Sequence, residues 1–190
     1  MKQLEDRILK DGVVLPGNVL KVGHFLNQNI DIDLLSAIAD EVASLYSESR
    51  PTKVLTVEAS GIAFATAVGL RMNIPVVFAK KHTSSNVQGD ILSAPTHSYT
   101  HGTDYDMTIN RDFLDPAERI LIVDDFLAVG GALKSLISLV EQSGAQLVGC
   151  AIMIEKTFQG GGDELRAKGI RVESLAQVET MSEDSLTFRK

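Results

Sequence analysis

The chain alternates between short apolar runs and longer segments in which apolar residues recur every three or four positions. Residues 119–123 and 148–154 are almost wholly apolar, and residues 53–57 and 75–79 are shorter runs of the same kind. Such runs are typical of parallel strands covered by helices on both faces, because neither face meets water. The pattern therefore predicts four buried parallel strands.

Three segments between and before these strands have helical periodicity. They are residues 34–46, 62–72 and 133–142. Asp31 or Asp33 is placed to cap the first of them, and Gly144 can end the last in a left-handed conformation. Strands that alternate with helices in this order predict an α/β fold with a mostly parallel central sheet, since parallel neighbours need crossover connections.

The polar insert at residues 80–116 differs in character from the rest of the chain. It holds three of the four histidines and many Thr, Ser and Asp residues, and residues 96–100 and 105–109 can pair around residues 101–104. A polar segment of this length within one domain is usually functional or mobile. We expect one domain over residues 1–190, with a core at about 31–154 and this insert as a mobile lid.

Composition and charge narrow the class of protein. The chain has 190 residues, a net charge of −7, 44% hydrophobic residues and a single cysteine, Cys150. The acidic balance disfavours nucleic-acid and anionic-membrane partners, and one cysteine excludes an internal disulfide. No apolar run approaches the roughly 20 residues that span a bilayer, and the charged start is unlike a signal peptide. We therefore expect a cytoplasmic protein.

The most informative segment is the strand and turn at residues 119–132. Two adjacent acids, Asp124 and Asp125, follow the apolar run, and Gly130 and Gly131 precede the next helix. Ligands of open α/β sheets bind outside the carboxyl ends of strands, and amides at a helix N-terminus favour a phosphate. The acids suit the vicinal hydroxyls of a sugar or a hydrated metal ion. One turn thus offers acceptors for a ribose and donors for its phosphate.

The same segment matches neither a P-loop nor a dinucleotide fingerprint. It resembles the ribose-phosphate-binding motif of the type I phosphoribosyltransferases, in which a strand, two acids and two apolar residues lead into a Thr-Gly-Gly-Thr turn. Val129 and Ala132 stand here where that family has threonines, so two hydroxyl donors are missing. The flanking segments, including residues 58–63, 76–82 and 154–159, are similar to those of bacterial members that act on xanthine.

The resemblance implies a fold and an activity. It implies a small hood built from residues 1–30 and 155–190 over the core. It also implies transfer of a phosphoribosyl group from phosphoribosyl pyrophosphate to xanthine, which gives xanthosine 5'-monophosphate and pyrophosphate in purine salvage. Mg²⁺ would be held mainly through phosphoribosyl pyrophosphate rather than by protein side chains alone. A homodimer is expected for the family.

The resemblance also assigns residues to tasks. Asp124 and Asp125 would face the ribose, and a lysine that starts the insert, Lys81 or equally Lys80, would neutralise the leaving pyrophosphate. The remaining assignments, grouped by ligand, are Ala128, Val129, Gly130, Gly131 and Ala132 for the 5-phosphate, Ser60 and Gly61 for pyrophosphate, and Leu20, Asn27, Lys156 and Phe158 for the purine base.

Two further motifs carry no function in this interpretation. His82, His97 and His101 have no common zinc spacing, and we expect them to be loop histidines. The run of glycines at residues 160–162 looks suited to phosphate, but Asp163 and Glu164 follow it and would repel an anion. We expect a flexible loop there.

Other functions stay open at this point. A salvage enzyme of the same fold could act on guanine, hypoxanthine or adenine instead. A non-catalytic regulator that binds phosphoribosyl pyrophosphate would carry the same motif but needs a DNA-binding unit, and residues 1–30 are short and not basic. An unrelated nucleotide-binding oxidoreductase is disfavoured, because the glycine fingerprint is missing.

Overall fold

A six-stranded sheet forms the centre of the molecule in the computed structural model, which describes residues 1–81, 89–98, 103–183 and 185–190. In chain order the elements are α1 (Lys2–Asp11), β1 (Val13–Leu15), β2 (Val19–Lys21), the π-helical turn η1 (Gly23–Asn27), α2 (Ile32–Tyr46), the 3₁₀ turn η2 (Ser47–Ser49), β3 (Lys53–Val57), α3 (Gly61–Met72), β4 (Val76–Ala79), β5 (Ile91–Ser98), β6 (Thr103–Asn110), η3 (Arg111–Phe113), β7 (Arg119–Leu127), α4 (Gly131–Ser143), β8 (Gln146–Lys156), η4 (Thr157–Gln159), α5 (Gly161–Ala167), β9 (Val172–Ser182) and β10 (Ser185–Phe188).

The predicted parallel sheet is confirmed. Its strand order is β10-β9-β8-β7-β3-β4, and all neighbours are parallel except β10, which runs antiparallel to β9. The four apolar runs of the sequence are β3, β4, β7 and β8. β7 is longer than predicted, so Asp124 and Asp125 lie within its last four residues instead of after its end.

The segment at residues 155–190 takes part in the central sheet, which the apolar pattern did not indicate. β9 pairs with β8 over several residues, and β10 then forms the edge of the sheet. Buried and half-exposed residues are mixed along β9, where Glu173 and Gln177 interrupt the apolar positions. A strand near the edge of a sheet is only partly covered and therefore lacks the continuous apolar run of a central strand.

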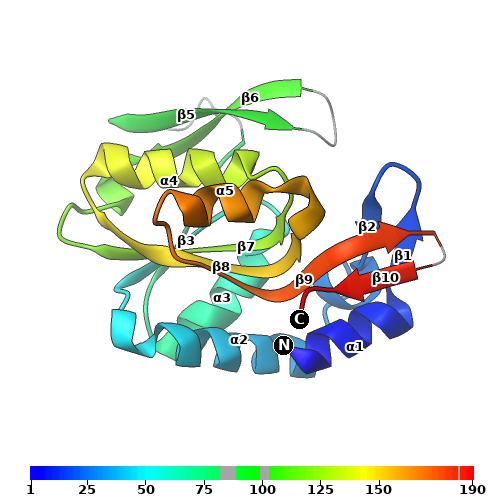
Figure 1. Ribbon diagram of the computed structural model, residues 1–190. Helices are drawn as coiled ribbons and strands as arrows, with labels where there is room; N and C mark the ends of the chain where they lie inside the picture. Colours follow the sequence, from blue (N-terminus) through cyan, green and yellow to red (C-terminus); the bar gives the residue numbers. More distant parts are fainter. Residues whose placement is uncertain (82–88, 99–102, 184) are drawn as a thin grey trace.

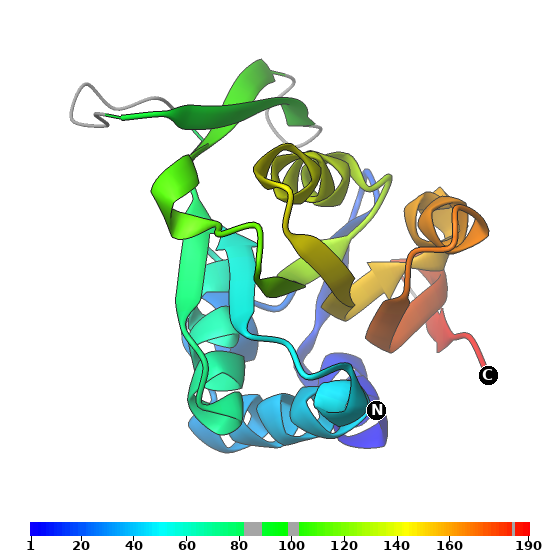
Figure 2. The same cartoon turned by 90° about the vertical axis from the view of Figure 1, so that its left-hand side faces the viewer.

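Helices cover both faces of the sheet, as Figures 1 and 2 show. α1, α2 and α3 lie on one face, and α4 and α5 lie side by side on the other. Fully buried Phe64 and Leu136 anchor the two apolar layers, and burying a side chain of this size stabilises by about 1.5–3 kcal/mol. The predicted caps are confirmed: Asp31 Oδ1 accepts from the Leu34 amide at 3.0 Å, and Gly144 has φ +81°.

The insert folds as a hairpin, β5–β6, that packs against α4 (Figure 1). The predicted hairpin is confirmed but its predicted pairing is not: Thr96 pairs with Tyr105, residues 91–95 pair with 106–110, and Thr103 and Asp104 belong to β6 rather than to the turn. The Ser135 hydroxyl on α4 donates to the Pro95 carbonyl at 2.8 Å. The remainder of the expected lid, residues 82–88 and 99–102 with His82 and His101, lies outside the described residues.

None of the helices within the described parts of the chain combines the length and the apolar character needed to cross a bilayer.

Candidate active site

The predicted site residues that follow parallel strands lie together where the carboxyl ends of these strands meet. The turn with Ser60 and Gly61 follows β3, Lys80 and Lys81 follow β4, and the last residue of β8 is Lys156. β7 lies between β3 and β8 and delivers the two acids. The parallel topology therefore assembles the site from four separate sequence segments.

The two acids form a buried pair with unlike environments. Asp124 and Asp125 are only 6% and 8% exposed, and Asp124 Oδ1 accepts from the Asp125 amide at 3.1 Å. Burial, together with the neighbouring charge of Asp125, raises the pKa of Asp124 well above its usual range, and the charge of Lys81 partly offsets this. Two carboxylates held out of water are suited to accept hydrogen bonds from hydroxyl groups or to face a cation.

The turn between β7 and α4 presents backbone amides without competing side chains. Gly130 has φ +83° and is the N-cap of α4, so no side chain accepts from the first amides of the helix. The first bond within the helix runs from the Lys134 amide to the Gly130 carbonyl at 2.9 Å. Because Val129 and Ala132 carry no hydroxyl groups, any donors to an anion here are backbone N–H groups.

The turn after β3 lies directly against the acids. A Cβ atom at Gly61 would overlap Thr56 Oγ1 and lie 3.3 Å from Asp124 Oδ1, so only glycine allows α3 to start this close. Ser60 is the N-cap of α3, and its side chain makes no capping bond. The peptide bond between Glu58 and Ala59 is cis, and Glu58 Oε1 accepts from the Lys81 amide at 2.7 Å.

The two lysines after β4 face different surroundings. The charge of Lys81 lowers the pKa of Asp124 slightly, and the Lys81 amide is held by Glu58 in the turn after β3. The backbone of Lys80 exchanges two 2.8 Å hydrogen bonds with Thr108 in β6, and its side chain lines an outer hollow beside Phe78 and Phe113. This arrangement favours Lys81 over Lys80 as the lysine of the site.

Asn27 of the N-terminal segment and Lys156 at the end of β8 are the polar residues predicted to bind the base. Asn27 Nδ2 donates to Asp125 Oδ2 at 3.4 Å, and Lys156 Nζ donates to the Asn18 carbonyl at 2.7 Å. Lys156 Nζ also lies 5.5 Å from the centre of the Phe126 ring, and burial lowers the pKa of Lys156. Thus an amide lies at Asp125, and an ammonium group lies over the aromatic ring that follows the acids in β7.

The other two predicted base-binding residues, Leu20 and Phe158, differ in burial. Leu20 in β2 is 6% exposed and belongs to the apolar core, and Phe158 in η4 is 42% exposed. The aromatic ring beneath Lys156 is Phe126, which the sequence analysis did not select. Phe126 follows the acids directly, but a lone aromatic residue in a predicted strand is more typical of a core, and only the tertiary contact with Lys156 distinguishes it.

Within the described residues, no group of three or more His, Cys, Asp or Glu side chains could hold a metal ion. The buried carboxyl groups of Asp124 and Asp125 are nevertheless oxygen ligands of the kind that Mg²⁺ prefers, and they lie next to each other at the end of β7. The pair therefore fits a magnesium ion that arrives with most of its coordination supplied by a phosphorylated ligand and water.

Comparison with known sequences agrees with this geometry. Residues 27–175 match the phosphoribosyl transferase domain family. The chain belongs to the phosphoribosyltransferase family. Its relatives include xanthine phosphoribosyltransferases from Lachnoclostridium phytofermentans, 49% identical over 98% of this chain and 96% of the relative, and from Limosilactobacillus reuteri, 45% identical over the whole of both chains. The Pseudomonas entomophila protein of the same name is 45% identical over 99% of both chains.

Solved structures of phosphoribosyltransferases share the fold. The APRTase from Giardia lamblia complexed with 9-deazaadenine aligns with a TM-score of 0.80 at 20% identity, covering 93% of this chain and 98% of that chain. The adenine phosphoribosyltransferase from Rhodothermus marinus aligns with a TM-score of 0.76 at 22% identity, covering 94% of this chain and 100% of that chain. The predicted type I phosphoribosyltransferase fold is thereby confirmed.

Proposed function

We infer that this phosphoribosyltransferase acts in purine salvage and transfers the phosphoribosyl group of phosphoribosyl pyrophosphate to xanthine, giving xanthosine 5'-monophosphate and pyrophosphate. The observation that carries the proposal is the β7–α4 turn, where buried Asp124 and Asp125 precede a helix that begins at Gly130 without a side-chain cap. Acceptors for ribose hydroxyls and donors for a phosphate therefore come from one continuous segment.

The choice of xanthine rests on two supports. Relatives that are 45–49% identical over nearly the whole chain are named xanthine phosphoribosyltransferases. In addition, Lys156 Nζ lies half-buried over Phe126 and can donate to an oxygen of an oxo-purine. Adenine offers an amino donor where xanthine offers an oxygen, and a buried donor without a partner would disfavour adenine strongly.

The reaction needs positioning more than a protein nucleophile. A ring nitrogen of the base forms the new bond to the anomeric carbon, the bond from that carbon to pyrophosphate oxygen breaks, and the proton on the ring nitrogen is released. We assign the ribose hydroxyls to Asp124 and Asp125 and the 5-phosphate to the amides of residues 128–132. Lys81 would neutralise charge on the leaving group, and the amides at Ser60 and Gly61 would bind it.

Base recognition would fall to the hood. We assign Asn27 and Lys156 to hydrogen bonds with the base and Leu20 and Phe158 to its apolar surroundings. Phe126, beneath Lys156, is the further aromatic candidate. Magnesium bound to phosphoribosyl pyrophosphate would neutralise part of its charge, with Asp124 and Asp125 oriented toward it.

Product analysis tests the proposal. The protein is mixed with phosphoribosyl pyrophosphate, Mg²⁺ and one of xanthine, guanine, hypoxanthine or adenine, and nucleotides are identified by mass spectrometry. We expect xanthosine 5'-monophosphate as the dominant product. Another nucleotide would refute the choice of base. No nucleotide from any base, with donor binding intact, would favour the non-catalytic regulator.

A Lys156→Met variant tests the base contact separately, because methionine keeps most of the side chain's length and removes its charge. We expect the KM for xanthine to rise by about tenfold or more, as loss of a charged hydrogen bond is worth about 1.5–3 kcal/mol. The KM for phosphoribosyl pyrophosphate should stay near that of the unmodified enzyme. Equal changes in both constants would contradict the assignment.

We also propose that the protein is a cytoplasmic homodimer. Exposed apolar side chains, Ile32 at 69% and Leu70 at 79%, flank a hollow between α2 and α3. A second hollow shares Leu70 with the first and reaches Pro75 and Val76, and a third hollow shares these two residues and is lined by exposed Phe78. A second copy that packs against this apolar surface would explain its exposure. Light scattering should give twice the chain mass, and Leu70→Glu should give monomers.

A further inference from the structure

The three glycines at residues 160–162 are expected from the sequence to form a flexible loop, but in the structure they form the start of α5. Gly160 has φ +78° and caps α5, and Gly161 and Gly162 are buried in its first turn. α5 lies beside α4 on the same face of the sheet (Figure 1). Lys134 on α4 pairs with Glu164 on α5 at 2.6 Å, which joins the two helices near their starts.

Gly161 contacts the backbone of the proposed phosphate turn. Its amide donates to the Ala128 carbonyl at 3.1 Å. A Cβ atom at Gly161 would overlap that carbonyl and lie 2.6 Å from the Val129 carbonyl carbon and 2.7 Å from the Gly130 amide nitrogen. Real side chains do not approach a backbone this closely, so α5 reaches the turn only because residue 161 has no side chain.

The hydrogen bond to the Ala128 carbonyl also fixes the direction of the Val129 amide, because both groups belong to the same peptide. In a trans peptide the carbonyl of one residue and the amide of the next point in opposite directions. With its carbonyl held by Gly161, the Ala128–Val129 peptide directs the Val129 amide away from α5. The amide thus becomes available to an anion without a rotation of the peptide on binding.

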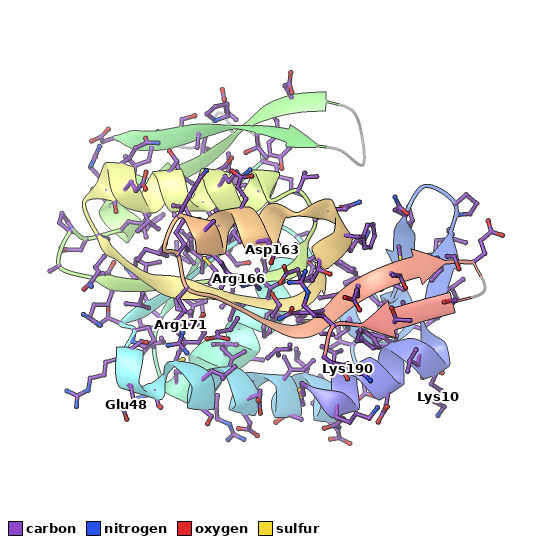
Figure 3. All side chains as sticks on the ribbon, viewed as in Figure 1. Lys10, Glu48, Asp163, Arg166, Arg171 and Lys190 are labelled. Atoms are coloured by element: carbon purple, nitrogen blue, oxygen red, sulfur yellow. The ribbon has the colours of Figure 1, made fainter. Side chains whose placement is uncertain are left out.

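A buried ion pair holds α5 in this position. Glu155 in β8 is fully buried, and the Arg166 guanidinium on α5 donates to its two oxygens at 2.9 and 2.6 Å. Figure 3 shows Arg166 and Asp163 together on α5, where Asp163 also pairs with Arg166 at 3.2 Å. A Cβ atom at Gly162 would overlap Glu155 Oε1, so this glycine lets the carboxylate lie against the helix backbone.

We propose that Gly161 is a positioning residue for the 5-phosphate, held in register by the Glu155–Arg166 pair. It keeps the peptide after Ala128 in the orientation that binds the donor. This inference rests on the proposed function for the identity of the ligand. It assigns a task to α5 that the β7–α4 motif alone does not supply.

A Gly161→Ala variant tests the proposal, with Gly169→Ala as the matched control. Gly169 lies just beyond the other end of α5, has φ +82° and has open space where a Cβ atom would be, so alanine there strains the backbone without touching the turn. We expect Gly161→Ala to raise the KM for phosphoribosyl pyrophosphate by about tenfold, the equivalent of one hydrogen bond. The KM for xanthine should change by less than about twofold in both variants.

Binding of ribose 5-phosphate, measured by calorimetry, separates this inference from the proposed function, because it needs no turnover. A wild-type protein that makes no nucleotide would refute the proposed function, while weaker ribose 5-phosphate binding by Gly161→Ala than by Gly169→Ala would still support the positioning role. Equal affinities in the two variants, or a parallel rise of both KM values, would overturn it.

An Arg166→Lys variant provides a second route if Gly161→Ala does not fold. Lysine keeps the charge beside Glu155 but loses the two-pronged geometry. We expect a smaller rise in the KM for phosphoribosyl pyrophosphate and weaker ribose 5-phosphate binding. Unchanged values for both quantities would overturn the role of the ion pair.

Discussion

Two glycine turns in this protein have nearly the same backbone and different surroundings. Each follows a parallel strand of the central sheet and caps a helix with a left-handed glycine, Gly130 with φ +83° before α4 and Gly160 with φ +78° before α5. After the first turn come Gly131 and Ala132, whereas Gly162, Asp163 and Glu164 follow the second. Acids in the first turn of a helix occupy the place that an anion would need.

The buried acids on the two preceding strands differ in whether an arginine binds them. Asp124 on β7 is buried beside another acid, and its pKa is raised. Glu155 on β8 is fully buried, but Arg166 binds both of its oxygens. The first turn thus keeps its amides free of side-chain caps, whereas at the second turn the Gly161 amide binds the Ala128 carbonyl of the first and the acid binds Arg166. The comparison shows that a glycine turn acquires its role from its neighbours.

The largest expected effect is on turnover at the first turn. Replacing Asp124 and Asp125 together by asparagine should lower kcat/KM by about 10³-fold, because groups aimed at the reacting sugar are lost. The protein should stay folded, since the change removes buried charge. Steady-state kinetics and circular dichroism check both parts, and near-normal turnover would remove the ribose assignment.

Substitution of the acid before the second turn should lower the stability of the fold. A Glu155→Gln substitution removes the buried partner of the Arg166 guanidinium, which keeps only its weaker pairing with Asp163, and should lower the free energy of unfolding by about 1–3 kcal/mol. Asp124→Asn, the matched change on β7, should not lower it. Urea denaturation of both variants measures the difference, and equal destabilisation would mean that the two acids do not differ as described.

Alanine substitutions at the two capping glycines separate the effect of backbone strain from the effect on ligand binding. Gly130→Ala and Gly160→Ala should each cost about 1 kcal/mol of stability, because both positions have positive φ, while a Cβ atom would meet only ordinary contacts at 3.6 Å at Gly130 and open space at Gly160. Only Gly130→Ala should raise the KM for phosphoribosyl pyrophosphate. A similar rise in both variants would show that the two turns share the ligand.

The smallest expected effect concerns pH. The pKa of Asp124 is raised by burial, so the folded state holds a proton that the unfolded chain releases, and stability should fall as the pH rises from about 4 through the raised pKa. Lys134 and Lys168 lower the pKa of Glu164 to about 2, so its contribution is present above about pH 4.5 and is lost as the pH falls through the folded pKa.

Melting temperatures between pH 2 and pH 8 check these opposite slopes. Asp124→Asn should flatten the decline above pH 4, and Glu164→Gln should flatten the loss below pH 4.5. A variant whose pH profile coincides with that of the unmodified protein would contradict the environment described for that acid.

The sequence predicted the central strands well and the edges of the fold poorly. β3, β4, β7 and β8 are covered on both faces, so their apolar runs are visible without the structure. β9 and the hairpin β1–β2 carry mixed polar and apolar residues, because each is partly exposed. The acids and Gly130 could likewise be selected from one contiguous motif, whereas Phe126 became a candidate only through its contact with Lys156.

The sequence by itself determined what depends on neighbours along the chain. It set the order of the four central strands and their helices, the adjacent acids Asp124 and Asp125, and the paired glycines before α4. Tertiary structure alone decided which segments meet: that the charge of Lys81 acts on Asp124, that Lys156 lies over Phe126, and that Gly161 at the start of α5 contacts a turn about 30 residues earlier in the chain. Contacts between distant segments depend on packing across the sheet, and no local pattern of residues records them.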